Sequence, residues 1–277
     1  MAGNRDEASR STEDLALSVQ GVAKTFRSQS GAEVAALAGL DVTAQRGEFL
    51  VLIGPTGCGK TTLLNILAGL EQPDDGEIHF AARLNRRNRV GYVFQHYTLL
   101  PWRTLLANVA FGLEMQGVAR SERNETARGL LAQVGLSDSE NAFPHEASGG
   151  MRQRAAIAQA LAVSPDILLM DEPFGALDDA TRKELQGLLV GLCRGSGTTV
   201  LFVTHNIDEA VVMADRILVF SPRPGRIVGE FPVRLPRPRD TLSDGFTELF
   251  VRVREVLHCP QPGRQQPDPG KHVRPSD

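Results

Sequence analysis

Short apolar runs and alternating stretches recur along the chain, and they predict a core built on β-strands. Residues 15–19 alternate apolar and polar positions, and residues 34–42 form another extended stretch, so an early antiparallel layer is expected. The apolar run 49–53 has the length of a buried strand. It enters a glycine-rich turn, and helical spacing follows over residues 60–70. The pattern therefore predicts a strand, a loop and a helix in succession.

Later apolar runs predict further strands separated by helices. A turn at residues 74–76 precedes a strand at residues 77–80. The other predicted strands cover residues 89–94, 166–170, 198–204 and 216–220. Helical spacing follows most of them, which is typical of a parallel sheet with helices on both faces.

The order of these signals divides the chain into segments. Helical signals replace strand signals between residues 97 and 162, so a helical subdomain is predicted to be inserted into a domain that spans residues 15–234. Residues 235–258 are predicted to hold a stiff linker and one amphipathic helix. The prolines that indicate the linker are Pro232, Pro236 and Pro238. Residues 1–14 and 259–277 are expected to be disordered, because they lack apolar stretches.

Composition and charge exclude several classes of protein. With 277 residues, 42% of them hydrophobic, the chain can bury a large core without disulfides or metals. A formal net charge of -3 and a pI near 6.1 provide no basic face, so no nucleic-acid partner is expected. No run approaches the roughly 18 apolar residues that cross a bilayer, and residues 1–13 have neither a signal-peptide nor an anchor pattern. The three cysteines lack a C-x-x-C spacing, which fits a reducing compartment such as the cytosol.

The glycine-rich turn after the first buried strand fits a phosphate-binding pattern. Residues 54–61 match G-x-x-x-x-G-K-[ST], a loop whose backbone N–H groups and helix N-terminus surround the phosphates of a nucleotide. Lys60 is predicted to reach the β and γ phosphates of ATP, and Thr61 is predicted to offer its hydroxyl to Mg²⁺. The predicted nucleotide contacts here are Gly54, Pro55, Thr56, Gly57, Cys58, Gly59, Lys60, Thr61 and Thr62.

Polar residues stand at the carboxyl ends of three other predicted strands. Asp171 and Glu172 end one strand, at the sheet edge where ligands bind in open α/β folds. Asp171 is predicted to hold Mg²⁺, directly or through water, and Glu172 to polarise the attacking water as a general base. Gln95 suits orienting water or Mg²⁺-bound oxygens, and His205 suits a hydrogen bond to the γ phosphate. Each alone is more often an ordinary strand end. The predicted catalytic residues are Lys60, Gln95, Glu172 and His205, and the predicted metal ligands are Thr61, Gln95 and Asp171.

A second glycine pair precedes a predicted helix that ends near residue 162. Ser148 is placed as its N-cap, and Gly149 and Gly150 expose backbone N–H groups, which predicts a second phosphate site. One nucleotide cannot easily lie against both sites of one chain when the second site is on the inserted subdomain. Two copies arranged head to tail are therefore the economical arrangement, and a capped helix without a ligand is the alternative.

Taken in order, these motifs resemble the nucleotide-binding subunit of ABC transporters. The matching elements are the phosphate loop, Gln95, residues 148–153, Asp171 with Glu172, residues 175–178, and His205, and the resemblance spans about residues 15–239. The resemblance implies an α/β fold of the P-loop NTPase (RecA-like) class, with a mostly parallel sheet, an N-terminal antiparallel β layer and an inserted α-helical subdomain. It also implies that Phe26 stacks on adenine and that Asp178 organises the opposing site of a dimer. An ordinary core phenylalanine is the alternative for Phe26.

Within that family, four stretches resemble the nitrate, sulfonate and taurine importer subgroup. They are residues 99–102, 148–154, 170–178 and 222–225. This resemblance implies an ATP-hydrolysing subunit that works as a homodimer or paired subunit beneath two membrane-spanning permease subunits, on the cytoplasmic face of the plasma membrane. The groove from Gln95 to Trp102 would receive a short permease helix, and a periplasmic or lipid-anchored binding protein would deliver the solute. For Trp102, a plain hydrophobic core is the alternative.

Some positions depart from the family pattern, and other classes of protein use the same loop. Ala147 stands where leucine is usual, Gln159 replaces a common arginine, and Asn206 replaces the usual aspartate after the histidine. A soluble ABC ATPase of DNA repair or translation remains an alternative, although it usually brings a coiled coil or a second cassette. A P-loop kinase or GTPase, and a non-catalytic binding subunit, are further alternatives.

Overall fold

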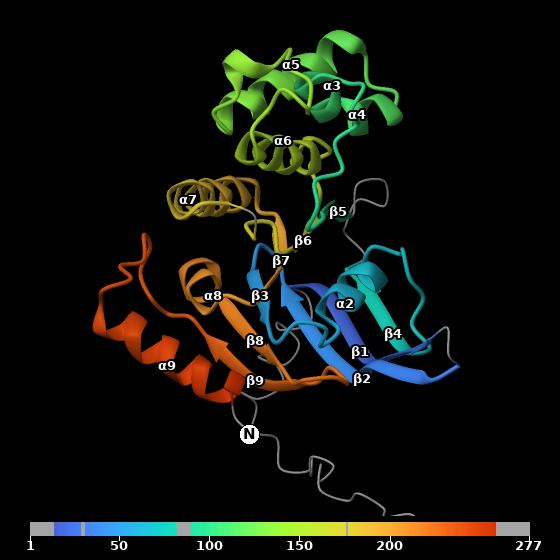
Figure 1. Cartoon of the computed structure of the whole chain (residues 1–277), viewed down its shortest axis with the longest axis vertical. Helices are drawn as coiled ribbons and strands as arrows, with labels where there is room; N and C mark the ends of the chain where they lie inside the picture. The colour runs from blue at the N-terminus through green and yellow to red at the C-terminus, as the bar shows by residue number, and fades with distance from the viewer. Residues whose placement is uncertain (1–13, 29–30, 82–89, 176, 259–277) are drawn as a thin grey trace, which may run out of the picture.

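The computed structural model of the protein describes residues 14–28, 31–81, 90–175 and 177–258, and its strands form two sheets (Figure 1). The smaller sheet has the order β2-β1-β4, and β1 pairs antiparallel with both neighbours. Its strands are β1 (Leu15–Arg27), β2 (Glu33–Gln45) and β4 (Asp75–Phe80). This sheet is the predicted antiparallel layer. The disorder expected for residues 1–14 and 259–277 falls, except at Asp14, outside the described residues.

The larger sheet has six strands in the order β5-β6-β7-β3-β8-β9. The first five strands run parallel, as predicted, and β9 pairs antiparallel with β8. Its strands are β3 (Phe49–Ile53), β5 (Val90–Val93), β6 (Ile167–Asp171), β7 (Thr199–Thr204), β8 (Arg216–Phe220) and β9 (Ile227–Pro232). Since parallel strands end at one edge, this order places the ends of β5, β6, β7 and β3 side by side.

Two local predictions are wrong, and pairing partners explain both. The proline pattern predicts that Pro232 belongs to a linker. Pro232 instead ends β9, which is an edge strand, and edge strands tolerate proline. The turn predicted at residues 74–76 overlaps the start of β4, because Asp75 and Gly76 belong to this strand, which pairs with β1. Gly76 has φ 86°, and a Cβ there would lie 2.5 Å from the Gln20 carbonyl oxygen, so the glycine serves close strand packing at a bulge rather than a turn.

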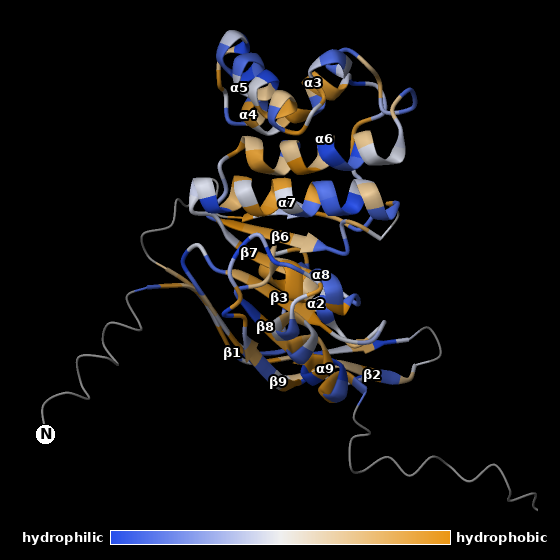
Figure 2. Ribbon diagram, turned by 90° about the vertical axis from the view of Figure 1, so that its left-hand side faces the viewer, coloured by the Kyte–Doolittle hydropathy of each residue, from blue (hydrophilic) through white to orange (hydrophobic). Residues whose placement is uncertain are grey.

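The larger sheet is buried on both faces, and β3 shows how. Phe49, Val51 and Ile53 face a cluster that includes the apolar residues of three helices: α7 (Asp179–Ser196), α8 (Ile207–Met213) and α9 (Asp244–His258). Leu50 and Leu52 face the opposite cluster, with α2 (Lys60–Leu67) and the smaller sheet. Figure 2 shows these strands in the orange of apolar residues, with blue on the helices around them. The alternation explains the continuous apolar run in the sequence.

A helical part lies at one end of the long axis of the molecule (Figure 1). Its helices are α3 (Leu105–Val109), α4 (Phe111–Met115), α5 (Arg120–Gln133), the 3-10 turn η1 (Ser137–Ser139) and α6 (Gly149–Ala162). They share a third apolar cluster, separate from the two beside the sheet. The predicted fold class, a P-loop NTPase core with an antiparallel layer and a helical insertion, is confirmed.

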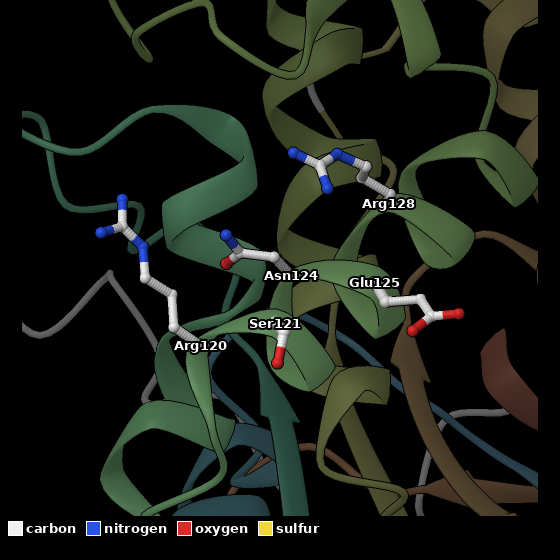
Figure 3. A pocket seen from close by; sticks show the side chains of 5 residues that line it. All are labelled: Arg120, Ser121, Asn124, Glu125 and Arg128. Carbon is white, nitrogen blue, oxygen red and sulfur yellow. The ribbon is translucent and has the colours of Figure 1, made fainter.

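Helix α5 buries only a narrow stripe. Ala127 and Leu131 are buried in the third cluster, whereas the opposite side is polar. Five residues on the polar side of α5 line a shallow hollow of about 610 Å³ (Figure 3). They are Arg120, Ser121, Asn124, Glu125 and Arg128. Within the described part of the chain, no helix is both long enough and apolar enough to cross a bilayer.

Candidate functional site

The phosphate loop leaves β3 at the carboxyl edge of the larger sheet and leads into α2. Gly59, the N-cap of α2, has φ 109°, in the region that favours glycine. Lys60 is buried, and its Nζ donates to the carbonyl oxygens of Gly54 at 2.7 Å and Pro55 at 3.1 Å. The lysine therefore bends back over the loop that precedes it, so its charge is aimed into the hollow of the loop, where a phosphate would lie.

Asp171 ends β6, which β7 separates from β3, and reaches the first turn of α2. Burial holds the pKa of this carboxyl above its ordinary value; a hydrogen bond from the Thr61 hydroxyl and the charge of Lys60 oppose that rise. A buried carboxylate beside a hydroxyl is an incomplete set of oxygen ligands for a hard cation. Gln95, exposed just beyond β5, adds an amide oxygen at the same sheet edge. These oxygens fit Mg²⁺.

Glu172 and His205 meet at the ends of β6 and β7. The Nδ1 atom of His205 lies 2.9 Å from the Glu172 carboxylate. Glu172 has φ 44°, a strained conformation for a residue with a side chain, and strain of this kind concentrates at functional sites. A cavity of about 70 Å³ borders both side chains, which is room for ordered water. The pair is placed to orient a water molecule at the sheet edge.

Phe26 is not a core residue. The residue is 40% exposed, and the Lys24 Nζ lies 5.4 Å from the ring centroid. In the β1–β2 register Phe26 pairs with Val34, two residues before Ala36, whose carbonyl oxygen lies against Gly59. The smaller sheet thus presents an open aromatic face near the loop.

The remaining predicted contacts form a second group around the starts of α6 and α7. Ser148 caps α6 as predicted, because its hydroxyl accepts from the Met151 N–H at 3.2 Å. Asp178 caps α7, and hydrogen bonds from the Thr181 N–H and hydroxyl hold its pKa below the ordinary value. A Cβ added to Gly150 would lie 3.2 Å from Thr181, so the two helix starts are neighbours. The structure brings these residues together, with Gly149 exposed and Gly150 partly exposed.

Comparison with known proteins identifies the family of this chain. Residues 37–175 match the family described as ABC transporter. The chain is 45% identical over 243 residues to an uncharacterized ABC transporter ATP-binding protein of Methanocaldococcus jannaschii, covering 87% of this chain and 91% of that protein. The chain belongs to the ABC transporter family. As a member of it, the chain binds ATP and is an ATPase.

Two taurine import ATP-binding proteins are also similar to this ABC ATPase. The one from Rhizobium johnstonii is 44% identical, with 84% of this chain and 93% of that protein covered. The one from Escherichia coli O6:K15:H31 (strain 536 / UPEC) is 46% identical, with 80% and 89% covered. Among solved structures, a dimeric ATP-binding cassette in a post-hydrolysis state with ADP and Pi bound has a TM-score of 0.70 and 33% identity, with 79% of this chain and 99% of that chain covered.

The structure also explains two departures of this ABC ATPase from its family pattern. Asn206 caps α8 by accepting from the Glu209 N–H at 3.2 Å, a role that asparagine and aspartate share. Ala147 is buried in the apolar cluster of the helical part, so its smaller side chain changes packing there. Nothing in the structure explains Gln159.

Sequence reasoning gave no role to two residues beside the site, Glu209 and Arg223. Glu209 accepts from the Thr204 hydroxyl at 2.6 Å directly behind His205, and burial raises its pKa. Arg223 donates from Nε to the Gly57 carbonyl oxygen at 3.0 Å. No local pattern predicts the second contact, because it joins residues 166 positions apart.

Proposed function

We propose that this ABC ATPase energises an importer for a small anion or organic solute of the nitrate, sulfonate or taurine type. The observation that carries the ATP-hydrolysing part of the proposal is the contact between Glu172 and His205 at the edge that also holds the phosphate loop. Similarity to two taurine import ATP-binding proteins supports the importer class. Nitrate, alkanesulfonates, taurine, bicarbonate and pyrimidine precursors all remain open as cargo, because this subunit contacts the permease and not the solute.

Nucleotide binding begins at the phosphate loop. The N–H groups of residues 54–62 hold the phosphates, and Lys60 leaves the Gly54 and Pro55 carbonyl oxygens to contact the β and γ phosphates. Thr61, Gln95 and Asp171 are the residues that would hold Mg²⁺. When bound, the ion neutralises charge on the phosphate oxygens. Phe26 stacks on adenine through its exposed face.

Hydrolysis takes place between the loop and the pair of Glu172 and His205. Glu172 accepts a proton from the attacking water, and its contact with His205 fixes the orientation of the carboxylate. His205 reaches the γ phosphate with its other ring nitrogen. Gln95 orients the water from the end of β5. These roles place proton transfer and phosphate recognition on adjacent strands.

Ser148, Gly149 and Gly150 bind the γ phosphate of the nucleotide held by a second copy, and Asp178 organises the same contact. Two features support a head-to-tail dimer. These residues sit together at the starts of α6 and α7, apart from the loop at the end of β3. A similar solved cassette is dimeric. Each nucleotide is then held by one loop and one opposing helix start.

The surface from Gln95 to Trp102 is proposed to receive a permease helix. Trp102 is 71% exposed and Tyr97 is 41% exposed, which argues against the core alternative for the tryptophan. The protein then lies on the cytoplasmic face of the plasma membrane, with a periplasmic or lipid-anchored binding protein delivering the solute to the permease. A net charge of -3 gives a nucleic acid no electrostatic footprint.

The catalytic proposal is tested with Glu172→Gln in the full chain. We expect the variant to bind MgATP, to remain a dimer in gel filtration with ATP, and to hydrolyse at least about 100-fold more slowly. Glu255→Gln makes the same substitution on the exposed side of α9 and is the matched control. Wild-type turnover in Glu172→Gln would remove the base assignment.

The importer assignment is tested on membranes. The full chain, copurified with its permease partner and placed in vesicles, is supplied in turn with taurine, an alkanesulfonate and nitrate. We expect uptake of one of these that requires ATP inside the compartment holding this subunit. Copurification with a ribosome or a DNA-repair complex, and with no permease, contradicts the importer assignment while leaving the ATPase activity in place.

A further inference from the structure

The turn that joins β8 to β9 packs against the outside of the phosphate loop. It consists of residues 221–225, Ser-Pro-Arg-Pro-Gly, a stretch that the proposed mechanism does not use. Arg223 donates from Nε to the Gly57 carbonyl oxygen at 3.0 Å. A Cβ added to Gly54 would lie 2.8 Å from the Cβ of Phe220, the last residue of β8. The loop is therefore in contact with this part of the chain at its beginning and in its middle.

Gly225 shows how close the turn approaches. A Cβ added there would lie 2.3 Å from the Cys58 carbonyl oxygen, so a side chain has no room at this position. The Gly225 N–H donates to the Ala36 carbonyl oxygen at 2.8 Å, and the Ala38 N–H donates to the Gly225 carbonyl oxygen at 3.3 Å. The turn is thereby fastened to β2 while its backbone rests on the loop.

Ser221 holds the turn in shape from inside. Its buried hydroxyl accepts from the Arg226 N–H at 3.1 Å, and its single proton is shared between the carbonyl oxygens of Pro222 at 2.9 Å and Pro224 at 3.0 Å. These bonds engage main-chain groups at both ends of the turn, so they hold it in one shape.

The contact of Arg223 has a direct consequence for phosphate binding. The Gly57 carbonyl and the Cys58 N–H belong to one planar trans peptide unit and point in opposite directions. Fixing the carbonyl with a guanidinium therefore directs the Cys58 N–H away from the turn, toward the inside of the loop. There it donates to the Pro55 carbonyl oxygen over a long 3.3 Å, a weak bond that a phosphate oxygen can replace.

A glycine-rich loop needs such support. Gly57 and Gly59 both have positive φ, at 76° and 109°, and glycine loses more conformational freedom on ordering than any other residue. A loop already held in its binding shape is ordered at less entropic cost when the nucleotide arrives. The guanidinium also polarises the peptide unit and so strengthens the N–H as a donor.

We propose that the turn 221–225 preorders the phosphate loop from outside and that Arg223 is a positioning residue for nucleotide binding, acting through the Gly57–Cys58 peptide. The inference depends on the proposed role of residues 54–62 as the phosphate site. Because this loop holds the phosphates before and after hydrolysis, removal of the support weakens MgATP and MgADP binding equally. The rate constant kcat stays unchanged, since no group that reacts is moved.

The experiment compares Arg223→Ala, Arg223→Lys and Arg226→Ala in the full chain, with MgATP and MgADP binding measured by calorimetry. Arg226 is the matched control, because it is an exposed arginine three positions away whose hydrogen bond comes from the main-chain N–H. We expect Arg223→Ala to weaken both nucleotides by about 5- to 10-fold and to raise KM equally, with kcat and the thermal midpoint unchanged. Arg223→Lys recovers part of the affinity because it restores a charged donor.

Three outcomes would overturn the inference. Wild-type affinity in Arg223→Ala removes the positioning role. Equal weakening in Arg226→Ala shows that general positive charge, and not the contact with Gly57, attracts the nucleotide. A loss of kcat without a change in KM assigns Arg223 to the chemical step instead. If the wild-type protein itself binds no MgATP, the phosphate site fails, and the inference, which depends on it, fails with it.

Discussion

Single residues of the phosphate loop depend on backbone conformations that only glycine adopts without strain. Gly59 has φ 109°, and a Cβ at this position would lie 2.7 Å from the Ala36 carbonyl oxygen and 2.8 Å from the Leu37 side chain. The residue therefore has neither the torsional freedom nor the space for a side chain. The loop keeps its hollow because its glycine residues carry no side chains.

This gives a prediction for Gly59→Ala. We expect the substitution to lower the free energy of unfolding by about 1–3 kcal/mol, through backbone strain and the close contact with β2. Urea unfolding of the nucleotide-free protein measures the change. Gly187→Ala is the control: Gly187 lies inside α7 with open space around it, and alanine should stabilise that helix by about 0.5–1 kcal/mol. Equal effects of the two substitutions would show that the strain at Gly59 is absent.

The buried thiol of Cys193 also allows a residue-scale prediction. Burial raises its pKa to about 12, and the thiolate is the form that reacts with alkylating reagents. We expect this cysteine to remain unmodified by iodoacetamide at pH 8 in the folded protein and to react once urea unfolds it. Peptide mass spectrometry identifies the labelled position. Rapid labelling of Cys193 in the native protein would contradict the burial.

At the scale of elements, the segment between β9 and α9 holds α8 in place behind the site. This segment, residues 233–243, is called the C-terminal arm below. Arg239 Nη1 donates to the carbonyl oxygens of Val211 at 2.6 Å and Val212 at 3.0 Å, which belong to the last turn of α8. Burial lowers the pKa of Arg239 to about 10, so the side chain still carries its charge at neutral pH. A cation at a helix C-terminus satisfies carbonyls that have no partner within the helix.

We therefore expect Arg239→Met to lower the free energy of unfolding by about 1–3 kcal/mol, because it removes the arginine donor of the Val211 carbonyl oxygen and leaves Val212 with the longer bond from Arg237 alone. Chemical denaturation followed by circular dichroism measures the difference. Arg234→Met removes an exposed arginine from the same arm and serves as the control. Equal stability of Arg239→Met and the wild type would show that the arm does not support α8.

A second element-scale prediction concerns the start of α6. Ser148→Ala removes the hydroxyl that accepts from the Met151 N–H, and the loss of an N-cap costs about 1 kcal/mol. Ser148→Asp keeps a capping oxygen but places a negative charge where the opposing phosphate is proposed to bind. We expect Ser148→Asp to fold like the wild type and to fail in ATP-dependent dimerisation, measured by light scattering. Dimerisation of Ser148→Asp with wild-type affinity would contradict the second phosphate site.

At the scale of the whole molecule, nucleotide binding is coupled to folding through the loop. A ligand present at 100 times its Kd stabilises the folded state by about 2.7 kcal/mol. We expect MgATP to raise the thermal midpoint of the wild type and to leave that of Lys60→Ala unchanged, because Lys60 supplies the buried charge that faces the phosphates. Differential scanning fluorimetry with Mg²⁺ alone is the control. An equal rise in Lys60→Ala would place the nucleotide elsewhere.

Local patterns were sufficient for much of the fold and the site. The run 49–53 and the glycine spacing after it predicted a strand, a loop and a helix, because burial and backbone conformation are properties of a few neighbouring residues. The same reasoning located Asp171 and Glu172 at the end of a buried strand. Helix α2 nevertheless ends at Leu67 rather than at residue 70, since helix ends depend on local hydrogen bonds that spacing does not specify.

What the sequence determined by itself was therefore local: the buried strands, the phosphate loop, and which polar residue follows each strand. Only the tertiary structure decided which of them are neighbours. The order β5-β6-β7-β3 puts Glu172 against His205, 33 positions away, and the β8–β9 turn brings Arg223 to Gly57, 166 positions away. Such contacts arise from sheet order and packing, which depend on the burial of the whole apolar surface and not on any one segment.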